Sequence, residues 1–140
     1  MEMTKAQPAP RVLVAEDDPV MRHLVSAVVQ KGGYEAVVVE DGREAVRLLQ
    51  RDANFGAAIV DMSMPHIEGI DVIRHMRTEK RLMRIPVMMI TSEQDHKLMK
   101  DSFGAGATVF LPKPFTPAQL QTMLGMIVGR GGGAAKTPTK

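Results

Sequence analysis

The chain has 140 residues, of which 44% are hydrophobic and 24% are charged, as is typical of one soluble globular domain. It contains no cysteine, which excludes disulfide bonds and thiolate metal sites. Residues 129–140 carry three basic residues and no acid, so removing their +3 from the net charge of +2 leaves −1 for the remainder. With only 4% aromatic residues as well, we expect no direct binding to nucleic acid.

The two ends of the sequence differ in composition from its middle. Residues 1–10 are polar and contain proline, and no stretch reaches the roughly 18 apolar residues of a membrane span. We therefore expect no membrane insertion and a cytoplasmic location. The predicted organisation is a disordered N-terminal tail at 1–10, a folded domain at 11–128, and a flexible, basic, Gly-rich tail or linker at 129–140.

The folded part begins with a strand and a helix. Val12 to Ala15 is an apolar run bounded by polar residues, which predicts a buried strand. A helix is predicted next, because Asp18 can cap it, Pro19 suits its first turn, and the glycine pair at 32–33 ends it. Its apolar positions recur every four residues, at Val20, Leu24 and Val28.

The same alternation of strand and helix then repeats four times. Further strands are predicted at Tyr34 to Val39, Ala57 to Val60, Pro86 to Ile90 and Thr108 to Leu111. Helices are predicted at Gly42 to Arg51, Ile70 to Thr78, Asp95 to Phe103 with a stop at Gly104, and Thr116 to Val128. Parallel strands need long crossovers, which place helices on both faces of the sheet. The pattern therefore predicts an α/β three-layer sandwich with a five-stranded parallel sheet and five helices.

Polar residues follow four of the predicted strands. They are Glu16 and Asp17 after the first strand, Asp61 after the third, Thr91 and Ser92 after the fourth, and Lys113 after the fifth. The carboxyl ends of parallel strands share one edge of the sheet, so we expect these side chains to meet there. Three carboxylates repel one another unless a cation or proton compensates, and oxygen ligands without His or Cys favour a Mg²⁺-like ion.

This set of residues suits phosphoryl transfer to a carboxylate. Such a reaction needs an ionised nucleophile and positive charge near the phosphoryl oxygens. Asp61 is the predicted nucleophile, Mg²⁺ and Lys113 are the predicted sources of positive charge, and the hydroxyl of Thr91 is a predicted hydrogen-bond donor to the phosphate.

Each of these residues also has a purely structural interpretation. Acids at 16–18 favour a helix N-terminus, and for Asp18 capping is the interpretation that we adopt. Taken alone, Asp61 is typical of a turn, Ser92 of a helix cap, and Lys113 of a solvated surface. Their expected meeting at one edge of the sheet favours a functional site over these separate structural roles.

The motifs that carry these residues resemble the receiver domains of two-component response regulators. The matching segments are 14–19 (VAEDDP), 60–65 (VDMSMP) with Gly69, Thr91-Ser92, 104–107 (GAGA) and 111–115 (LPKPF). The resemblance spans about Arg11 to Val128. It implies a flavodoxin-like strand order 2-1-3-4-5 and a chemotaxis-regulator-like phosphoprotein in which Asp61 accepts a phosphoryl group from a histidine kinase or a histidine phosphotransfer protein.

The resemblance also implies a role for each site residue. Asp17 and Asp61 would contact Mg²⁺ directly, Glu16 largely through a metal-bound water, and Ser63 through its backbone carbonyl. Lys113 would pair with the phosphoryl group, and its peptide bond to Pro114 would be cis. Thr91 would act as the switch hydroxyl, with Phe110 following it inward, although filling the core is an equally good interpretation of Phe110.

The implied output face comprises the fourth helix, fifth strand and fifth helix, with Lys97, Lys100, Phe110 and Gln119, and it would bind a downstream effector protein. The domain would catalyse only its own phosphorylation and dephosphorylation, as a monomer or weak dimer. The alternative is a pseudo-receiver that acts as a constitutive protein-interaction module. An aspartyl-phosphate hydrolase is disfavoured, because no general acid or base lies two residues after Asp61. The sequence identifies neither the kinase, the pathway, the phosphorylation lifetime nor any domain after residue 140.

Overall fold

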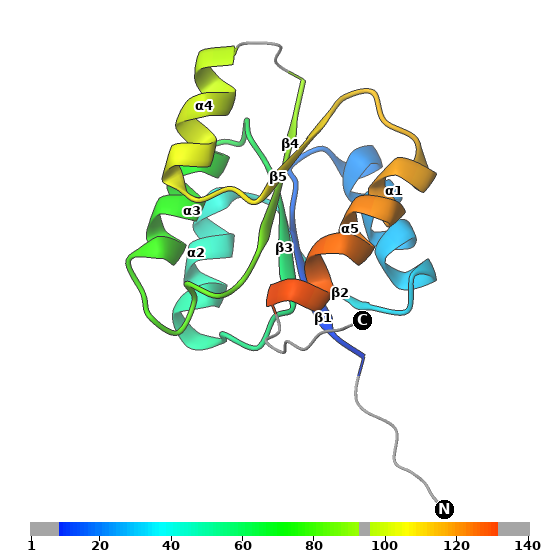
Figure 1. The fold of residues 1–140 in the computed structure, drawn as a ribbon, viewed down its shortest axis with the longest axis horizontal. Helices are drawn as coiled ribbons and strands as arrows, with labels where there is room; N and C mark the ends of the chain where they lie inside the picture. The colour runs from blue at the N-terminus through cyan, green and yellow to red at the C-terminus, as the bar shows by residue number, and fades with distance from the viewer. Residues whose placement is uncertain (1–8, 93–95, 132–140) are drawn as a thin grey trace, which may run out of the picture.

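Five parallel strands form one sheet in the order β2-β1-β3-β4-β5, as predicted. The structure is a computed structural model that describes residues 9–92 and 96–131. The strands are β1 (Arg11–Ala15), β2 (Glu35–Val39), β3 (Ala57–Asp61), β4 (Val87–Thr91) and β5 (Val109–Pro112). The helices are α1 (Pro19–Lys31), α2 (Gly42–Arg51), α3 (Gly69–Arg77), α4 (His96–Ala105) and α5 (Pro117–Gly131). The predicted three-layer sandwich is confirmed: α2, α3 and α4 cover one face of the sheet, and α1 and α5 cover the other (Figure 1).

Each face of the sheet carries its own hydrophobic core. The core under α2, α3 and α4 includes Leu13, Val60, Ile73 and Met89, and the core under α1 and α5 includes Val14 and other strand residues. Neighbouring strand residues point to opposite faces, so a run such as Val12 to Ala15 fills both cores at once. All five residues of β3 are buried, which fixes the position of Asp61 at its end.

Local capping explains where the helices begin. Asp18 accepts a hydrogen bond of 2.9 Å from the backbone N–H of Met21 and caps α1, with Pro19 in the first turn as predicted. Thr116 and Gln119 cap α5 reciprocally: Gln119 N donates to Thr116 Oγ1 at 3.1 Å, and Thr116 N donates to Gln119 Oε1 at 2.8 Å. These reciprocal bonds satisfy N–H groups that have no partner inside the helix.

Two details of the predicted helices are wrong. Val20 is not on the buried face of α1, since it is 77% exposed. The buried residues are Val25, Val28 and Val29, because a helix buries a stripe spaced by three and four residues rather than by four alone.

The second error concerns helix ends. α4 continues through Gly104 to Ala105, and Gly106, with φ of 119°, is the glycine in the left-handed region. α5 extends to Gly131, beyond the predicted end at Val128. The predicted start of the fourth helix, at Asp95, lies outside the described residues.

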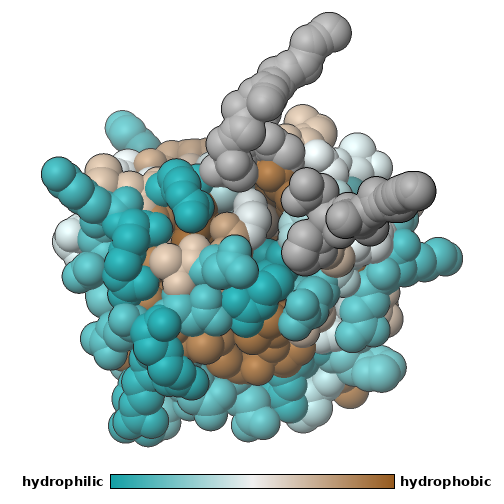
Figure 2. Space-filling view, turned by 90° about the horizontal axis from the view of Figure 1, so that it is seen from below, coloured by the Kyte–Doolittle hydropathy of each residue, from teal (hydrophilic) through white to brown (hydrophobic). Residues whose placement is uncertain are grey.

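The surface is polar with hydrophobic interruptions. Figure 2 views the molecule from the end of the sheet at which the strands begin and shows a hydrophobic area framed by hydrophilic side chains. Within residues 9–92 and 96–131, no helix combines the length and hydrophobicity that a bilayer span requires.

Gly69 holds the start of α3 against the end of β3, and its replacement tests that packing. A Cβ at Gly69 would lie 2.3 Å from the carbonyl oxygen of Asp61 and 3.0 Å from Cα of Met62. Because both are backbone atoms, we expect Gly69→Ala to lower the free energy of unfolding by about 1–3 kcal/mol. Urea denaturation measures this change.

The matched control is Gly125→Ala in α5. Nothing lies within 4 Å of its added Cβ, so the helix propensity of alanine should raise stability by up to about 1 kcal/mol. If both substitutions shift the urea midpoint in the same direction, close packing at Gly69 does not position the end of β3.

Candidate functional site

Three acids meet at the carboxyl end of the sheet. Glu16 and Asp17 follow β1, and Asp61 is the last residue of β3. β1 and β3 are paired with Ala15 opposite Val60, which brings one carboxylate oxygen of each acid within 4.8 Å of the others. Glu16 is 2% exposed and Asp61 is 5% exposed, whereas Asp17 is open to solvent. The predicted convergence of these three acids is therefore confirmed.

Backbone contacts of Arg22 fix the loop that presents the first two acids. From the first turns of α1, Arg22 Nη1 donates to the carbonyl oxygens of Glu16 at 3.0 Å and Asp17 at 3.2 Å. The N–H of Asp18 donates to Glu16 Oε2 at 3.1 Å. The loop is thus tied to α1 from the backbone side, while its carboxylates face the site.

Lys113 supplies the positive charge. Its Nζ lies 3.7 Å from Asp61 Oδ2 and 4.0 Å from Glu16 Oε1. Its backbone N–H donates to the carbonyl of Thr91 at 2.7 Å, and its peptide bond to Pro114 is cis, as predicted. The lysine is therefore bound to the site by its backbone as well as by its charge.

Thr91 lies deeper than the acids. It is the last residue of β4 and is 1% exposed, and its Oγ1 donates to Met62 Sδ at 3.6 Å. Sulfur is a weak acceptor, so this bond is easily exchanged for one to oxygen. Ser92 is exposed, and residues 93–95, through which it would cap the next helix, lie outside the described part of the chain.

The burial of Glu16 beside other carboxylates favours binding of a cation. Burial and the neighbouring charge of Asp61 raise the pKa of Glu16 from 4.5 to about 7, although the backbone N–H of Asp18 and the charge of Lys113 oppose the rise. Glu16 Oε1 is buried without a hydrogen-bond partner among the described residues. An orphaned buried oxygen beside two further carboxylates is a donor set that fits a hard divalent cation such as Mg²⁺.

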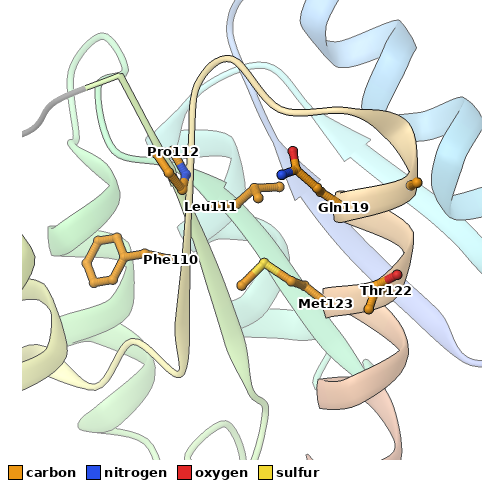
Figure 3. A pocket seen from close by; sticks show the side chains of 7 residues that line it. Phe110, Leu111, Pro112, Gln119, Thr122 and Met123 are labelled. Atoms are coloured by element: carbon orange, nitrogen blue, oxygen red, sulfur yellow. The ribbon is translucent and has the colours of Figure 1, made fainter.

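Phe110 packs inward from β5. It is 7% exposed, and its ring meets that of Phe103 on α4 edge to face, with centroids 4.7 Å apart at 72°. On the other side of β5, a hollow of about 470 Å³ opens against α5, lined in part by Leu111, Gln119 and Met123. Figure 3 shows the ring of Phe110 directed away from these three side chains. The core-filling interpretation of Phe110 thus describes this conformation.

Comparison with known proteins agrees with this geometry. Residues 12–125 match the family model of the response regulator receiver domain. The chain belongs to the response regulator receiver family. It is 32% identical over 120 residues to chemotaxis protein CheY1 of Helicobacter pylori (strain ATCC 700392 / 26695), covering 85% of this chain and 97% of the relative.

Solved receiver structures share the fold. The chemotaxis response regulator CheY4 of Vibrio cholerae superposes with a TM-score of 0.80 at 31% identity, covering 85% of this chain and 98% of that one. The receiver domain of sensor histidine kinase PA1611 from Pseudomonas aeruginosa PAO1 gives a TM-score of 0.79 at 29% identity, covering 86% and 98%. That structure holds a magnesium ion coordinated in its active-site cleft. This chain is thus a signalling domain of two-component type.

Sequence reasoning missed Arg22 and the packing role of Gly69. The signal for Gly69 was its place in the family motif. The only signal for Arg22 was its position in the first turns of a helix that begins directly after two site acids.

The raised pKa of Glu16 predicts a pH-dependent stability for the metal-free domain. Glu16 binds its proton more tightly in the folded state, so stability falls as pH rises from 4.5 to about 7. Glu16→Gln removes this cost and should raise the free energy of unfolding at pH 8 by on the order of 1–3 kcal/mol, with a smaller gain at pH 5. Urea denaturation in EDTA at the two pH values measures the difference.

Glu35→Gln is the control, since it changes an exposed carboxylate on β2 and should change stability little at either pH. An equal effect of Glu16→Gln at pH 5 and pH 8 would contradict the proposed cost of ionising Glu16.

Proposed function

We propose that this domain is a phosphorylation switch whose acceptor is Asp61. The observation that carries the proposal is the surroundings of its carboxylate. Asp61 is buried at the end of β3, with Lys113 Nζ 3.7 Å from one oxygen and the N–H of Ser63 donating to the other at 3.3 Å. Such a carboxylate is a nucleophile with positive charge and donors already beside it.

The residues that would hold Mg²⁺ are Asp17 and Asp61 directly, Glu16 largely through water, and Ser63 through its backbone carbonyl. When bound, the ion supplies positive charge to the equatorial phosphoryl oxygens. The carboxylate cluster and the orphaned Oε1 of Glu16 support this assignment.

The chemistry proposed for the chain itself is a displacement at phosphorus. An oxygen of Asp61 forms a bond to phosphorus while the bond from phosphorus to the phosphohistidine nitrogen, or to the oxygen of a small acyl phosphate, breaks. The leaving group takes the electron pair of that bond. Lys113 Nζ neutralises charge on the transferred group, and the hydroxyl of Thr91 turns from Met62 Sδ to donate to a phosphoryl oxygen.

The switch would pass from Thr91 to Phe110 through paired strands. β4 and β5 place Met89 opposite Phe110 and Thr91 opposite Pro112. Movement of Thr91 toward the phosphate would shift β4 and the start of α4, and with them the packing of Phe110 against Phe103. The effector would then bind the face formed by α4, β5 and α5.

The proposed partners are a histidine kinase or histidine phosphotransfer protein upstream and an effector protein downstream, with the domain monomeric or weakly dimeric. The only catalysis proposed is its own phosphorylation and dephosphorylation. The cytoplasmic location, the domain limits at 11–128 and the flexible ends at 1–10 and 129–140 stay predictions from the sequence.

Incubation with acetyl phosphate and Mg²⁺ tests the acceptor. Intact-mass spectrometry should show one added phosphoryl group on the wild type, none on Asp61→Asn, and none in EDTA. Asp71→Asn, at an exposed acid of α3, is the matched control and should be phosphorylated like the wild type. A wild type without any adduct would instead favour the pseudo-receiver, in which the acidic pocket is unused.

Arg22 should act as a positioning residue for the acids. Arg22→Gln removes both bonds to the loop carbonyls, so we expect Mg²⁺ affinity to fall about tenfold, the lower end of outer-shell effects at metal sites. Isothermal titration calorimetry measures the affinity. His23→Gln, at the adjacent exposed position, should leave it unchanged, and equal affinities for all three proteins would show that the loop needs no such support.

Once an effector protein has been identified, alanine substitutions test the proposed output face. Alanine at Lys97, Lys100, Phe110 or Gln119 should each weaken its binding to the phosphorylated domain by severalfold, as measured by calorimetry. If all four variants bind like the wild type, the effector uses another surface.

A further inference from the structure

The outer edge of β2 is the sheet edge opposite β5. β2 pairs only with β1 in the strand order, and no strand of the described residues lies on its other side. An unpaired edge presents a row of backbone N–H and C=O groups that another strand can pair with. β5, which belongs to the proposed output face, forms the opposite edge of the sheet (Figure 1).

A groove runs between this edge and α2. It encloses about 440 Å³ and is lined by Val37, Val38, Val39, Glu44, Arg47, Leu48 and Arg51; we call it the β2–α2 groove. Its apolar lining on the α2 side comes from Val37, Val39 and Leu48, whereas Val38, which is 40% exposed, points to the opposite face of the sheet.

The charged groups of the groove are not balanced. Arg47 and Arg51 are exposed and four residues apart on α2, which places them on one side of the helix. Glu44 is engaged elsewhere, because its Oε1 accepts the N–H of Glu40 at 3.0 Å and thereby helps to cap α2. Asp52, the acid next to Arg51, already binds Arg11 at 2.8 Å.

Neither arginine has an ion-pair partner within residues 9–92 and 96–131. Among the described residues, no carboxylate lies within 4.0 Å of the guanidinium of Arg47 or Arg51. Arg51 Nη1 donates only to the backbone carbonyl of Arg47, at 3.3 Å. The groove thus combines an apolar floor, an unpaired strand edge and two guanidinium groups available to a partner's acids.

We propose that the β2–α2 groove binds an extended segment of a partner protein in which acidic and apolar residues alternate, added as a strand beside β2. Successive side chains of an added strand point to opposite faces of the sheet. Val37 and Leu48 pack with the core under α2, so every second side chain would face Arg47 and Arg51 and should be acidic. The intervening side chains lie beside Val38, on the other face, and should be apolar.

A second copy of this chain fits less well. Antiparallel pairing of two β2 edges in full overlap would set Glu35 of one copy against Val39 of the other. It would also place both α2 helices on the same face, so that Arg47 and Arg51 would meet arginines rather than acids, and like charges close together are destabilising. Nucleic acid also fits poorly, because the groove has an apolar floor and no aromatic side chain on which a base would stack.

The probe is a fluorescein-labelled peptide of alternating glutamate and valine residues, titrated with the full chain and followed by fluorescence anisotropy. We expect saturable binding that weakens with salt, and at least a tenfold loss of affinity in the double variant Arg47→Glu, Arg51→Glu. Arg74→Glu makes one such charge reversal, half the charge change of the double variant, at an exposed position of α3 and should cost less than twofold. Circular dichroism confirms that the variants are folded.

Two further arms separate strand addition from simple charge attraction. A peptide with alternate backbone nitrogens methylated cannot pair with β2 and should lose binding, and amide chemical shifts in the labelled protein should change at β2 and α2. Asp61→Asn should bind the peptide like the wild type, since the groove is independent of the acceptor. A failure of peptide binding can therefore be distinguished from a failure of the proposed phosphorylation at Asp61.

Several outcomes would overturn the proposal. The peptide could fail to bind at millimolar concentration, or Arg74→Glu could lose as much peptide affinity as the double variant. The methylated peptide, or a peptide with lysine in place of glutamate, could bind as tightly as the probe. Finally, the changes in amide chemical shift could be confined to α4, β5 and α5. Self-association that competes with the peptide, or displacement of the peptide by a DNA duplex, would assign the groove to another occupant.

Discussion

The structure depends on placing two carboxylates, Glu16 and Asp61, out of solvent beside each other. Burial raises the free energy of an ionised carboxylate, and a neighbouring carboxylate raises it further. Lys113 Nζ, 4.0 Å from Glu16 and 3.7 Å from Asp61, offsets part of this cost. The remaining cost is reflected in the pKa of Glu16, which is raised to about 7. A site in this condition gains more than an exposed one from a divalent cation and a phosphoryl group, because both supply missing interactions.

Much of the remaining architecture serves this arrangement. Pairing of β1 with β3 sets the acids side by side, and Gly69 lets α3 start against the end of β3. The backbone bond from Lys113 to Thr91 links the lysine to the residue proposed to respond to phosphate. The hydroxyl of Thr91 donates to sulfur, a weak acceptor, so this bond can be exchanged for one to a phosphoryl oxygen. The two edges of the sheet then face different environments: β5 carries the proposed output surface and β2 an open groove.

Features set by residue type at strand and helix ends were predictable from the sequence. Apolar runs located the strands, and Asp18 and Thr116 marked helix starts, because strand burial and capping are local properties. Which side of a helix is buried, in contrast, depends on how the helix packs against the rest of the fold. Val20 shares the four-residue spacing of its helix but lies in the first turn, outside the stripe at Val25, Val28 and Val29. Gly104 similarly did not end α4, which ends one residue later, just before the backbone turns left-handed at Gly106.

The residues of the candidate site likewise include some that the sequence predicted and some that it did not. Glu16, Asp17, Asp61, Thr91 and Lys113 follow strands, so the parallel topology alone predicted their meeting. The contribution of Arg22 was hidden, because it bonds to carbonyl groups and no motif records it. The inward orientation of the Phe110 ring could not be predicted from the sequence. It depends on packing against Phe103, which lies on a different element, α4.

The most direct test of the central claim locates the phosphoryl group chemically. After incubation with acetyl phosphate and Mg²⁺, reduction with borohydride converts an aspartyl phosphate to homoserine, which tandem mass spectrometry of the digested protein assigns to one position. The account predicts conversion at Asp61 alone, dependent on Mg²⁺. Conversion at Asp17 or at an exposed acid, or none at Asp61 when the intact protein carries phosphate, would contradict it.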